Sequence, residues 1–187
     1  MKGCVIVVDM LEDVVAAGHT LPITSHARAI VPTINELCRW ARRRGFPVVF
    51  ACDSFLPEDL LFRSKMTPHC LRGTPGAEPV ADLERAPDDE LLRKRRFSAF
   101  FKTDLDQSLR TWGVDTALVC GIATPYCVLT TALDAVSHDF RAIIVEDATA
   151  ANRPEVHAAV LDLYRRGPLE PLLAVRRTDD IYRAADE

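Results

Sequence analysis

The sequence lacks the patterns of a secreted, disulfide-rich or zinc-ribbon protein. Its six cysteines, at positions 4, 38, 52, 70, 120 and 127, lie mostly in apolar segments and form no CxxC pair, which argues against a disulfide framework or a zinc ribbon. Long apolar runs are also missing. The apolar strand that follows Met1 spans only about five residues, too few for a signal-peptide core or a membrane span. We therefore expect a cytoplasmic protein with no membrane partner.

An excess of positive charge is missing as well. The formal net charge is -4, so binding to nucleic acid would need a local basic patch. The only dense basic run extends from Arg93 to Arg96, and its arginines are most simply interpreted as a solvated strand end. We expect no nucleic-acid partner.

What is present is an ordinary globular composition, with 48% hydrophobic and 27% charged residues among 187. This length suits one domain, residues 1–187, with a core large enough to fold without disulfides or a structural metal.

Short apolar runs alternate with segments of helical periodicity along the chain. The first run, residues 5–8, is β-branched and ends at Asp9, as a parallel strand buried on both faces would. The alternation predicts an α/β fold, a Rossmann-like three-layer α/β/α sandwich with a mostly parallel sheet of about six strands. The expected strands are residues 5–8, 47–51, 90–93, 116–120, 142–145 and 171–175, and the expected helices are residues 25–44, 105–112, 128–137 and 155–166.

The periodicity weakens between residues 53 and 90, where proline and glycine recur. A loop of this length in a compact domain usually serves as a lid or a pocket wall, and disorder is the alternative. We expect a pocket wall over residues 53–90.

Three reactive side chains follow predicted strands, at the edge where ligands bind in parallel α/β sheets. Asp9 follows the first strand, Lys94 ends the segment 90–93, and Cys127 begins a helix. A helix N-terminus and a nearby lysine would favour the thiolate of Cys127, and Asp9 could exchange its proton. Taken singly, each residue is more often structural, because such an Asp commonly caps a turn and a free Cys commonly packs in the core.

The motifs around these residues resemble, in the same order, those of the isochorismatase-like cysteine hydrolases, a family that includes nicotinamidases and carbamoyl-amide hydrolases. The resemblance spans nearly the whole chain. It is carried by Val-Val-Asp-Met-Leu-Glu-Asp at 7–13, Lys-Arg-Arg-Phe-Ser-Ala-Phe at 94–100 and Gly-Ile-Ala-Thr-Pro-Tyr-Cys-Val at 121–128. Three such motifs in order make coincidence improbable.

The resemblance implies a hydrolase of non-peptide C–N bonds that forms a thioester. Cys127 would attack an amide carbonyl, Asp9 would act as general base and acid, and Lys94 would stabilise charge. A cis peptide between Ile122 and Ala123 is also implied, in a turn that continues to Thr124 and offers N–H donors to an oxyanion. The family's ether-cleaving members lack the cysteine, so its presence favours amide chemistry.

The sequence departs from the nicotinamidases at their metal site, which resembles Asp-x-His followed by a later His. Here the first part reads Asp53-Ser54-Phe55, and His69 matches the later histidine. Catalytic zinc usually has three protein ligands, so we expect no metal cofactor. If zinc or another divalent ion were bound, Asp53 and His69 would hold it, with help from a cysteine or Glu58. Otherwise His69 would hold the loop by hydrogen bonds to backbone or to Asp53.

The predicted pocket also differs from that of a nicotinamidase. Val14 stands where those enzymes carry Phe and Met66 where they carry Trp, which removes ring stacking. Phe55, Phe97 and Tyr126 would complete a different pocket for a small-molecule amide.

Two alternatives remain open. One is a nicotinamidase or pyrazinamidase with a rebuilt pocket and metal site, and the other is a catalytically inactive binding module on the same fold. The resemblance also implies a homo-oligomer of undefined size.

Overall fold

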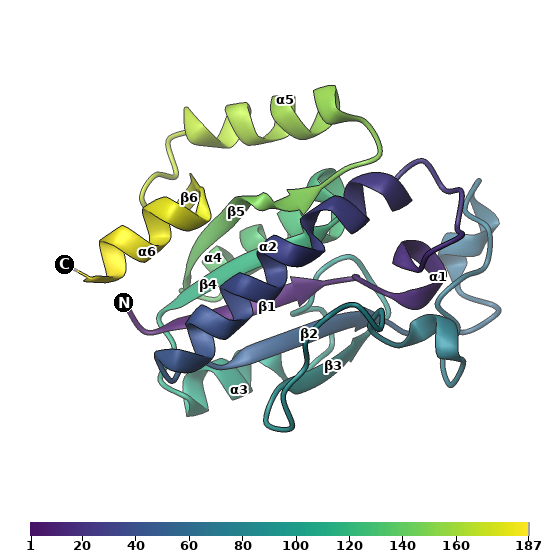
Figure 1. Cartoon of the computed structure of the whole chain (residues 1–187), viewed down its shortest axis with the longest axis horizontal. Helices are drawn as coiled ribbons and strands as arrows, with labels where there is room; N and C mark the ends of the chain where they lie inside the picture. Colours follow the sequence, from purple (N-terminus) through teal and green to yellow (C-terminus); the bar gives the residue numbers. More distant parts are fainter. Residues whose placement is uncertain (187) are drawn as a thin grey trace.

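One parallel sheet organises the computed structural model, which describes residues 1–186 (Figure 1). The strand order is β3-β2-β1-β4-β5-β6, and every pairing is parallel. This confirms the predicted α/β fold, although the described sheet is entirely rather than mostly parallel. The strands are β1 (Gly3–Val8), β2 (Val48–Asp53), β3 (Glu90–Lys94), β4 (Thr116–Ile122), β5 (Arg141–Ala150) and β6 (Leu173–Arg176).

Helices cover both faces of the sheet and give the predicted three layers. One hydrophobic cluster joins α2 and α6 to one face of the sheet, and a second cluster joins α3, α4 and α5 to the other face. Helix α2 crosses the front of the sheet in Figure 1. The helices are α1 (Glu12–Val15), α2 (Thr24–Arg43), α3 (Leu105–Thr111), α4 (Leu129–Ser137), α5 (Pro154–Arg165) and α6 (Thr178–Asp186), and a π-helical segment, η3 (Thr124–Val128), precedes α4.

The central strands form because their side chains are apolar on both faces. All residues of β1, β2 and β4 are buried, as expected for strands between two helical layers. α2 presents its apolar stripe to the sheet, including Ile30, Ile34 and Leu37. Gly45, with φ of 69°, follows its last turn as predicted.

Three elements differ from the prediction, the first being the one-turn helix α1, which was not predicted. β5 extends to Ala150, five residues beyond the predicted end, because the polar pair Glu146 and Asp147 interrupts the apolar pattern without interrupting the strand. Helix α6 was not predicted. Its aromatic Tyr182 packs on Trp40 of α2, with ring centroids 4.9 Å apart, a contact that the local sequence does not reveal.

The segment between β2 and β3 packs against the domain, as a wall would. It contains the 3₁₀ turns η1 (Leu60–Arg63) and η2 (Pro75–Ala77). Its apolar side chains enter the core next to α2, among them Cys70, Val80 and Leu83. In the described chain, no helix combines the length and apolarity needed to cross a membrane.

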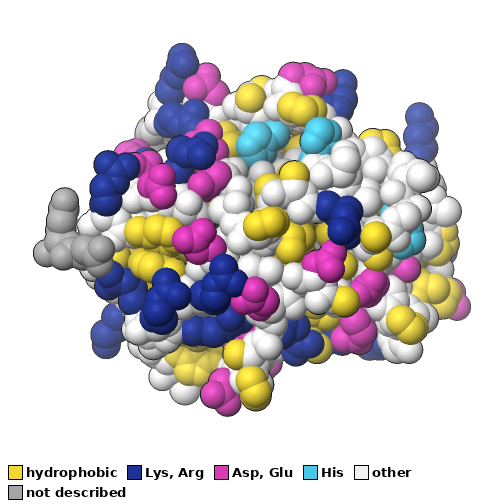
Figure 2. All heavy atoms as spheres, in the orientation of Figure 1, with side chains coloured by type: hydrophobic (Ala, Val, Ile, Leu, Met, Phe, Trp, Pro, Cys, Tyr) yellow, Lys and Arg dark blue, Asp and Glu magenta, His cyan; other side chains and the backbone are white. Residues whose placement is uncertain are grey.

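The surface in the orientation of Figure 1 carries charges of both signs, with lysine and arginine side chains interspersed among aspartate and glutamate (Figure 2). Many of these charges are paired across elements, as Arg39 is with Glu84 and Arg42 with Asp89.

Candidate functional site

The carboxyl ends of four adjacent strands bring four reactive side chains together. Asp9 follows β1, Asp53 ends β2, Lys94 ends β3, and Cys127 lies in η3, just after β4. Because β3, β2, β1 and β4 are neighbours in the sheet, their ends meet at one edge. The three residues predicted to be catalytic are therefore neighbours in space. Asp53 was predicted only as a metal ligand, yet it belongs to the same group.

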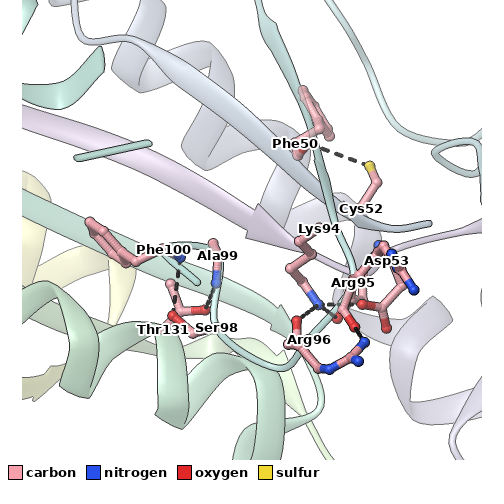
Figure 3. Close-up of polar contacts among 11 residues, drawn as sticks. Phe50, Cys52, Asp53, Lys94, Arg95, Arg96, Ser98, Ala99, Phe100 and Thr131 are labelled. Atoms are coloured by element: carbon pink, nitrogen blue, oxygen red, sulfur yellow. Dashed lines mark hydrogen bonds and ion pairs between the residues drawn. The ribbon is translucent and has the colours of Figure 1, made fainter. Parts of the chain in front are cut away.

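Lys94 is the centre of this group. Its Nζ lies 2.8 Å from Asp9 Oδ2 and 2.6 Å from Asp53 Oδ1, and it donates to the carbonyl oxygen of Arg96 at 3.2 Å. The side chain is fully buried. Figure 3 shows it directed toward Asp53 and Arg96. A buried ammonium with two carboxylates and a carbonyl uses its three donors fully.

Asp9 is held in place from two sides. The Asp53 N–H donates to Asp9 Oδ1 at 2.9 Å, so that Oδ2 is left for Lys94. The backbone of Asp9 has φ of 53°, a left-handed conformation that is costly for residues other than glycine and is concentrated at functional sites. The carboxylates of Asp9 and Asp53 and the Cys127 sulfur have atoms within 4.8 Å of one another. The Cys127 thiol therefore lies beside the Asp9 carboxylate.

Burial and charge decide the protonation of these groups. Burial, followed by the charge of Asp9, raises the pKa of Asp53 to about 7, although Lys94 opposes both effects. For Lys94, burial would lower the pKa, but Asp9, Cys127 and Asp53 together raise it well above its ordinary value. The lysine is therefore a fixed cation, and the group around it carries at most a small net charge.

The prediction of a resting thiolate at Cys127 is wrong. Burial, followed by the charge of Asp9, raises the pKa of the Cys127 thiol well above its ordinary value, and Lys94 offsets this only in part. The expected effect of a helix N-terminus is outweighed because the sulfur is buried beside two carboxylates. The raised pKa favours the protonated thiol in the free protein.

The turn between β4 and Cys127 has an unusual backbone. The peptide bond between Ile122 and Ala123 is cis, as the resemblance implied. Gly121 has φ of 98°, and a Cβ at this position would lie 2.2 Å from the Val8 carbonyl oxygen. Only glycine permits β4 to approach β1 so closely at the base of the turn.

Thr124 anchors this turn to α5. It is fully buried, and its Oγ1 lies 2.8 Å from Nδ1 of His157. Burial lowers the pKa of His157, while Glu146 acts in the opposite direction, which favours the neutral imidazole. Sequence reasoning did not identify His157, because it lies outside the three motifs in an ordinary amphipathic helix.

The residues at the expected metal position do not suit a metal ion. Asp53 is engaged by Lys94, and Phe55 has no donor atom. Nδ1 of His69 faces the Thr67 carbonyl oxygen at 2.8 Å, as predicted for a loop-holding histidine. Of the described residues, the group able to contribute ligand atoms is Asp9, Asp53 and Cys127. The Lys94 ammonium lies against both of its carboxylates, and its positive charge already satisfies them.

The predicted pocket residues are not all arranged as walls. Phe55 is 2% exposed and packs edge-on against Phe62, with centroids 5.3 Å apart, so it fills the core. Phe97 and Tyr126 are exposed, and their ring centroids lie 6.2 Å apart. Tyr126 directly precedes Cys127 in the chain. Val14 and Met66 are partly buried.

A cavity of about 260 Å³ is lined in part by Lys94, and none of the five predicted pocket residues lines it. The run from Arg93 to Arg96, interpreted from the sequence as a solvated strand end, forms its wall, and its arginines are half-buried. The arginines remain partly exposed at the end of the strand, as that interpretation implies, and they also border this cavity. The remaining lining residues are Arg72, Phe101 and Lys102.

Comparisons with known proteins agree with the fold. Residues 3–174 match the profile of the Isochorismatase domain family. A protein of Arabidopsis thaliana described as a probable inactive nicotinamidase is 35% identical over 179 residues, which cover 90% of this chain and 91% of that protein.

Two solved structures share the fold at comparable identity. The structure of N-carbamoylsarcosine amidase from Thermoplasma acidophilum has a TM-score of 0.83 and 32% identity, with 96% of this chain and 98% of that chain covered. Pyrazinamidase of Pyrococcus horikoshii in complex with zinc has a TM-score of 0.80 and 31% identity, with 95% and 99% covered.

Proposed function

Because this chain belongs to the isochorismatase family of hydrolases, we propose that it cleaves the C–N bond of a small amide with Cys127 as nucleophile. The observation that carries the proposal is the arrangement around Lys94. Its buried ammonium fixes Asp9 at 2.8 Å, and the Cys127 sulfur lies within 4.8 Å of an Asp9 carboxylate oxygen. Nucleophile, base and fixed positive charge are thus grouped before substrate arrives.

The first half of the reaction forms a thioester. The Cys127 sulfur attacks the amide carbonyl while its proton passes to Asp9, so no free thiolate has to accumulate despite the raised pKa. The carbonyl oxygen becomes an oxyanion, and N–H groups of the turn from Ile122 to Thr124 stabilise it. Asp9 then delivers the proton to the departing nitrogen, which leaves as ammonia or an amine when the C–N bond breaks.

The second half releases the acid product. Asp9, again a carboxylate, removes a proton from water as the water attacks the thioester carbonyl. The C–S bond breaks and the thiol regains its proton. Lys94 remains protonated throughout because its pKa is raised well above the ordinary value. Its role is to hold Asp9 and to offset the negative charge that moves between Asp9 and Cys127.

No metal is assigned to this mechanism. The donor atoms expected for one are either bound to Lys94 or replaced by Phe55, as described above. We therefore propose chemistry by the side chains alone, with a small-molecule amide as the sole partner required.

Two alternatives have specific support. The likeness to a pyrazinamidase favours a nicotinamidase or pyrazinamidase with a rebuilt pocket, although the buried Phe55 and the partly buried Val14 and Met66 argue for a different substrate. The relative described as probably inactive favours a binding module without catalysis. The intact contacts of Lys94 with Asp9 argue against this second alternative.

We propose a cytoplasmic setting for the protein. All six cysteines are unpaired, which suits the reducing cytoplasm. The family resemblance supports a homo-oligomer. Residues 1–187 are proposed to act as one domain.

Ammonia release from a panel of small amides tests the proposal. The panel includes nicotinamide, ureido compounds and N-carbamoyl compounds, and Cys127→Ser and Cys38→Ser are assayed beside the unsubstituted protein. Cys38 is a matched control because it is also buried but lies in α2. We expect release that Cys127→Ser abolishes and Cys38→Ser retains. Turnover of nicotinamide alone would favour the first alternative.

Labelling by iodoacetamide separates the remaining outcomes. A covalent intermediate requires that Cys127 be reachable by a small electrophile, so it should be alkylated before the other five cysteines. No turnover of any amide, combined with no preferential labelling of Cys127, would favour the binding module.

A further inference from the structure

The turn that leads from β4 to Cys127, residues 122–127, is here called the nucleophile turn. Its base is fixed where Gly121 allows β4 to approach β1 closely. Further along, the Thr124 hydroxyl lies 2.8 Å from Nδ1 of His157 in α5. This hydrogen bond is a side-chain contact between the nucleophile turn and a helix that is distant in the sequence.

Thr124 is placed so that a small shift of its position would affect both parts of the proposed chemistry. Its own N–H belongs to the turn from Ile122 to Thr124 that is proposed to stabilise the oxyanion. It is also the first residue of η3, in which Cys127 is the fourth. Its side chain is fully buried, whereas that of Tyr126 is exposed. A contact that fixes Thr124 therefore fixes the direction of the nucleophile turn.

The direction of the hydrogen bond follows from the hydroxyl proton. Across residues 1–186, no hydrogen bond joins Thr124 Oγ1 to a group other than His157. If Nδ1 carried a proton, it would donate to Oγ1 and leave the buried hydroxyl proton without an acceptor, which costs free energy. The hydroxyl is therefore the donor and Nδ1 the acceptor, and the ring proton of the neutral imidazole is on Nε2.

The ring of His157 can exchange protons with solvent. The residue is half-buried, and it lines a cavity of about 320 Å³ with Glu146 of β5 and with Asp162 and Arg165 of its own helix. Arg165 lies 2.9 Å from Glu146 and 3.7 Å from Asp162, so that these charges largely offset one another.

The other elements packed against α5 add little charge to this region. They are η3 and β6. No residue of η3 is charged at neutral pH, and Arg176 of β6 is paired with Glu170. Burial lowers the pKa of His157, while Glu146 acts in the opposite direction. His157 is therefore neutral at neutral pH, and it gains a proton only below its ordinary pKa of 6.5.

We propose that His157 is a positioning residue whose neutral imidazole holds the nucleophile turn in place. Nδ1 accepts the Thr124 hydrogen bond and thereby orients the N–H groups of the turn and the Cys127 sulfur. When His157 is protonated, Nδ1 becomes a donor, the hydroxyl proton loses its acceptor and the contact weakens. His157 thus acts through Thr124 and not on the reacting atoms. This inference rests on the proposed function, because it concerns the same reaction.

Two substitutions separate the acceptor from the charge. His157→Asn keeps an acceptor near the position of Nδ1 but cannot be protonated, and His157→Leu has no acceptor. At about pH 8, where the imidazole is neutral, His157→Leu should lower kcat about fivefold with KM within about twofold, the effect of one lost hydrogen bond. His157→Asn should restore kcat to within about twofold. Thr124→Val should match His157→Leu, and the double variant should be no slower than either, because both remove the same contact.

The pH profile provides a result that a merely structural role would not produce. Between about pH 8 and about pH 5 the unsubstituted protein loses the acceptor and His157→Asn keeps it. The ratio of kcat of this variant to that of the unsubstituted protein should therefore rise up to about fivefold as pH falls. Asp53 titrates in both proteins, so its effect cancels in the ratio. His138→Asn is the matched control, because His138 stacks on Phe100 outside the nucleophile turn, and its ratio should stay level.

Nitrogen NMR of the imidazole tests the assigned hydrogen bond without substrate. We expect the His157 proton on Nε2 at neutral pH and a pKa below 6.5. Thr124→Val should raise this pKa, because it removes the hydrogen bond that favours the neutral form. A proton on Nδ1 of the neutral ring, or a His157 pKa that Thr124→Val leaves unchanged, would overturn the proposal.

The outcomes distinguish the two proposals. A level kcat ratio for His157→Asn, or unaltered kcat in His157→Leu, would overturn the positioning role and leave the amidohydrolase intact. If no amide is hydrolysed, the proposed function fails, and the rate of Cys127 alkylation by iodoacetamide then reports the position of the turn. That rate should change about threefold or more in His157→Leu and stay within about twofold in His157→Asn. Equal rates in all three proteins would reject the positioning role.

Discussion

Replacement of Asp53 by asparagine gives the sharpest test of how the buried charges are balanced. Burial is the main cause that raises the pKa of Asp53 from an ordinary 3.8 to about 7. As pH rises above about 4, the unfolded chain loses this proton while the folded protein keeps it. The stability that Asp53 contributes is therefore complete below pH 3.8, falls as pH rises, and is lost near pH 7.

The size of this effect follows from the shift. About three pKa units at about 1.4 kcal/mol each give an upper figure of about 4 kcal/mol. The asparagine side chain of the variant has no proton to lose, so the free energy of unfolding of Asp53→Asn, relative to the unsubstituted protein, should rise by up to that amount between about pH 4 and pH 8. Urea denaturation at several pH values across this range measures the difference.

Asp59→Asn is the matched control. The Arg95 hydrogen bond lowers the pKa of Asp59 to about 2, so the stability it contributes is lost only as pH falls below about 4. Its difference from the unsubstituted protein should be flat over the same range. A flat or falling difference for Asp53→Asn would refute the reasoning, because it would mean that Asp53 is ionised in the folded protein at low pH.

Three further predictions concern the same edge of the sheet. Lys94→Met should abolish turnover and cost about 3 to 5 kcal/mol of stability near neutral pH, because Asp9 and Asp53 lose the ammonium that both contact. Ammonia release measures the loss of turnover and urea denaturation measures the loss of stability. Near-normal stability of the variant would contradict the ion-pair argument. Gly121→Ala should lower stability by about 3 kcal/mol or more, since its Cβ would meet the Val8 carbonyl oxygen at 2.2 Å. Gly18→Ala is the control for the positive φ, because a Cβ at Gly18 meets no atom within 4 Å. Dialysis against a chelator should leave activity unchanged, and activity that is lost and then restored by zinc would show that the assignment without metal is mistaken.

The strand ends explain why the proposed catalytic residues could be grouped from the sequence. Asp9 follows β1, Lys94 ends β3 and Cys127 follows β4 after a short turn, and parallel topology brings such ends to one edge. The sequence therefore predicts that Asp9, Lys94 and Cys127 lie together. The same periodicity predicted α2 to within one residue at each end.

The errors arise where residues distant in sequence interact. Helix α6 depends on a contact between Tyr182 and Trp40. Strand β5 continues past Glu146, where its pairing with β4 shifts register and resumes at Thr149 and Ala150. Such elements are stabilised by tertiary packing that overrides local pattern.

The sequence by itself determined the fold class, and it predicted the edge at which chemistry can occur and Asp9, Lys94 and Cys127 as its reactive residues, because periodicity and motif order are local properties. Only the tertiary structure decided that Asp53 shares the Lys94 ammonium, that burial and the charge of Asp9 raise the pKa of the Cys127 thiol, and that the basic run lines a cavity. These properties depend on burial and on charges from separate strands. Both are set by distances in the folded chain, and no spacing along the sequence encodes them.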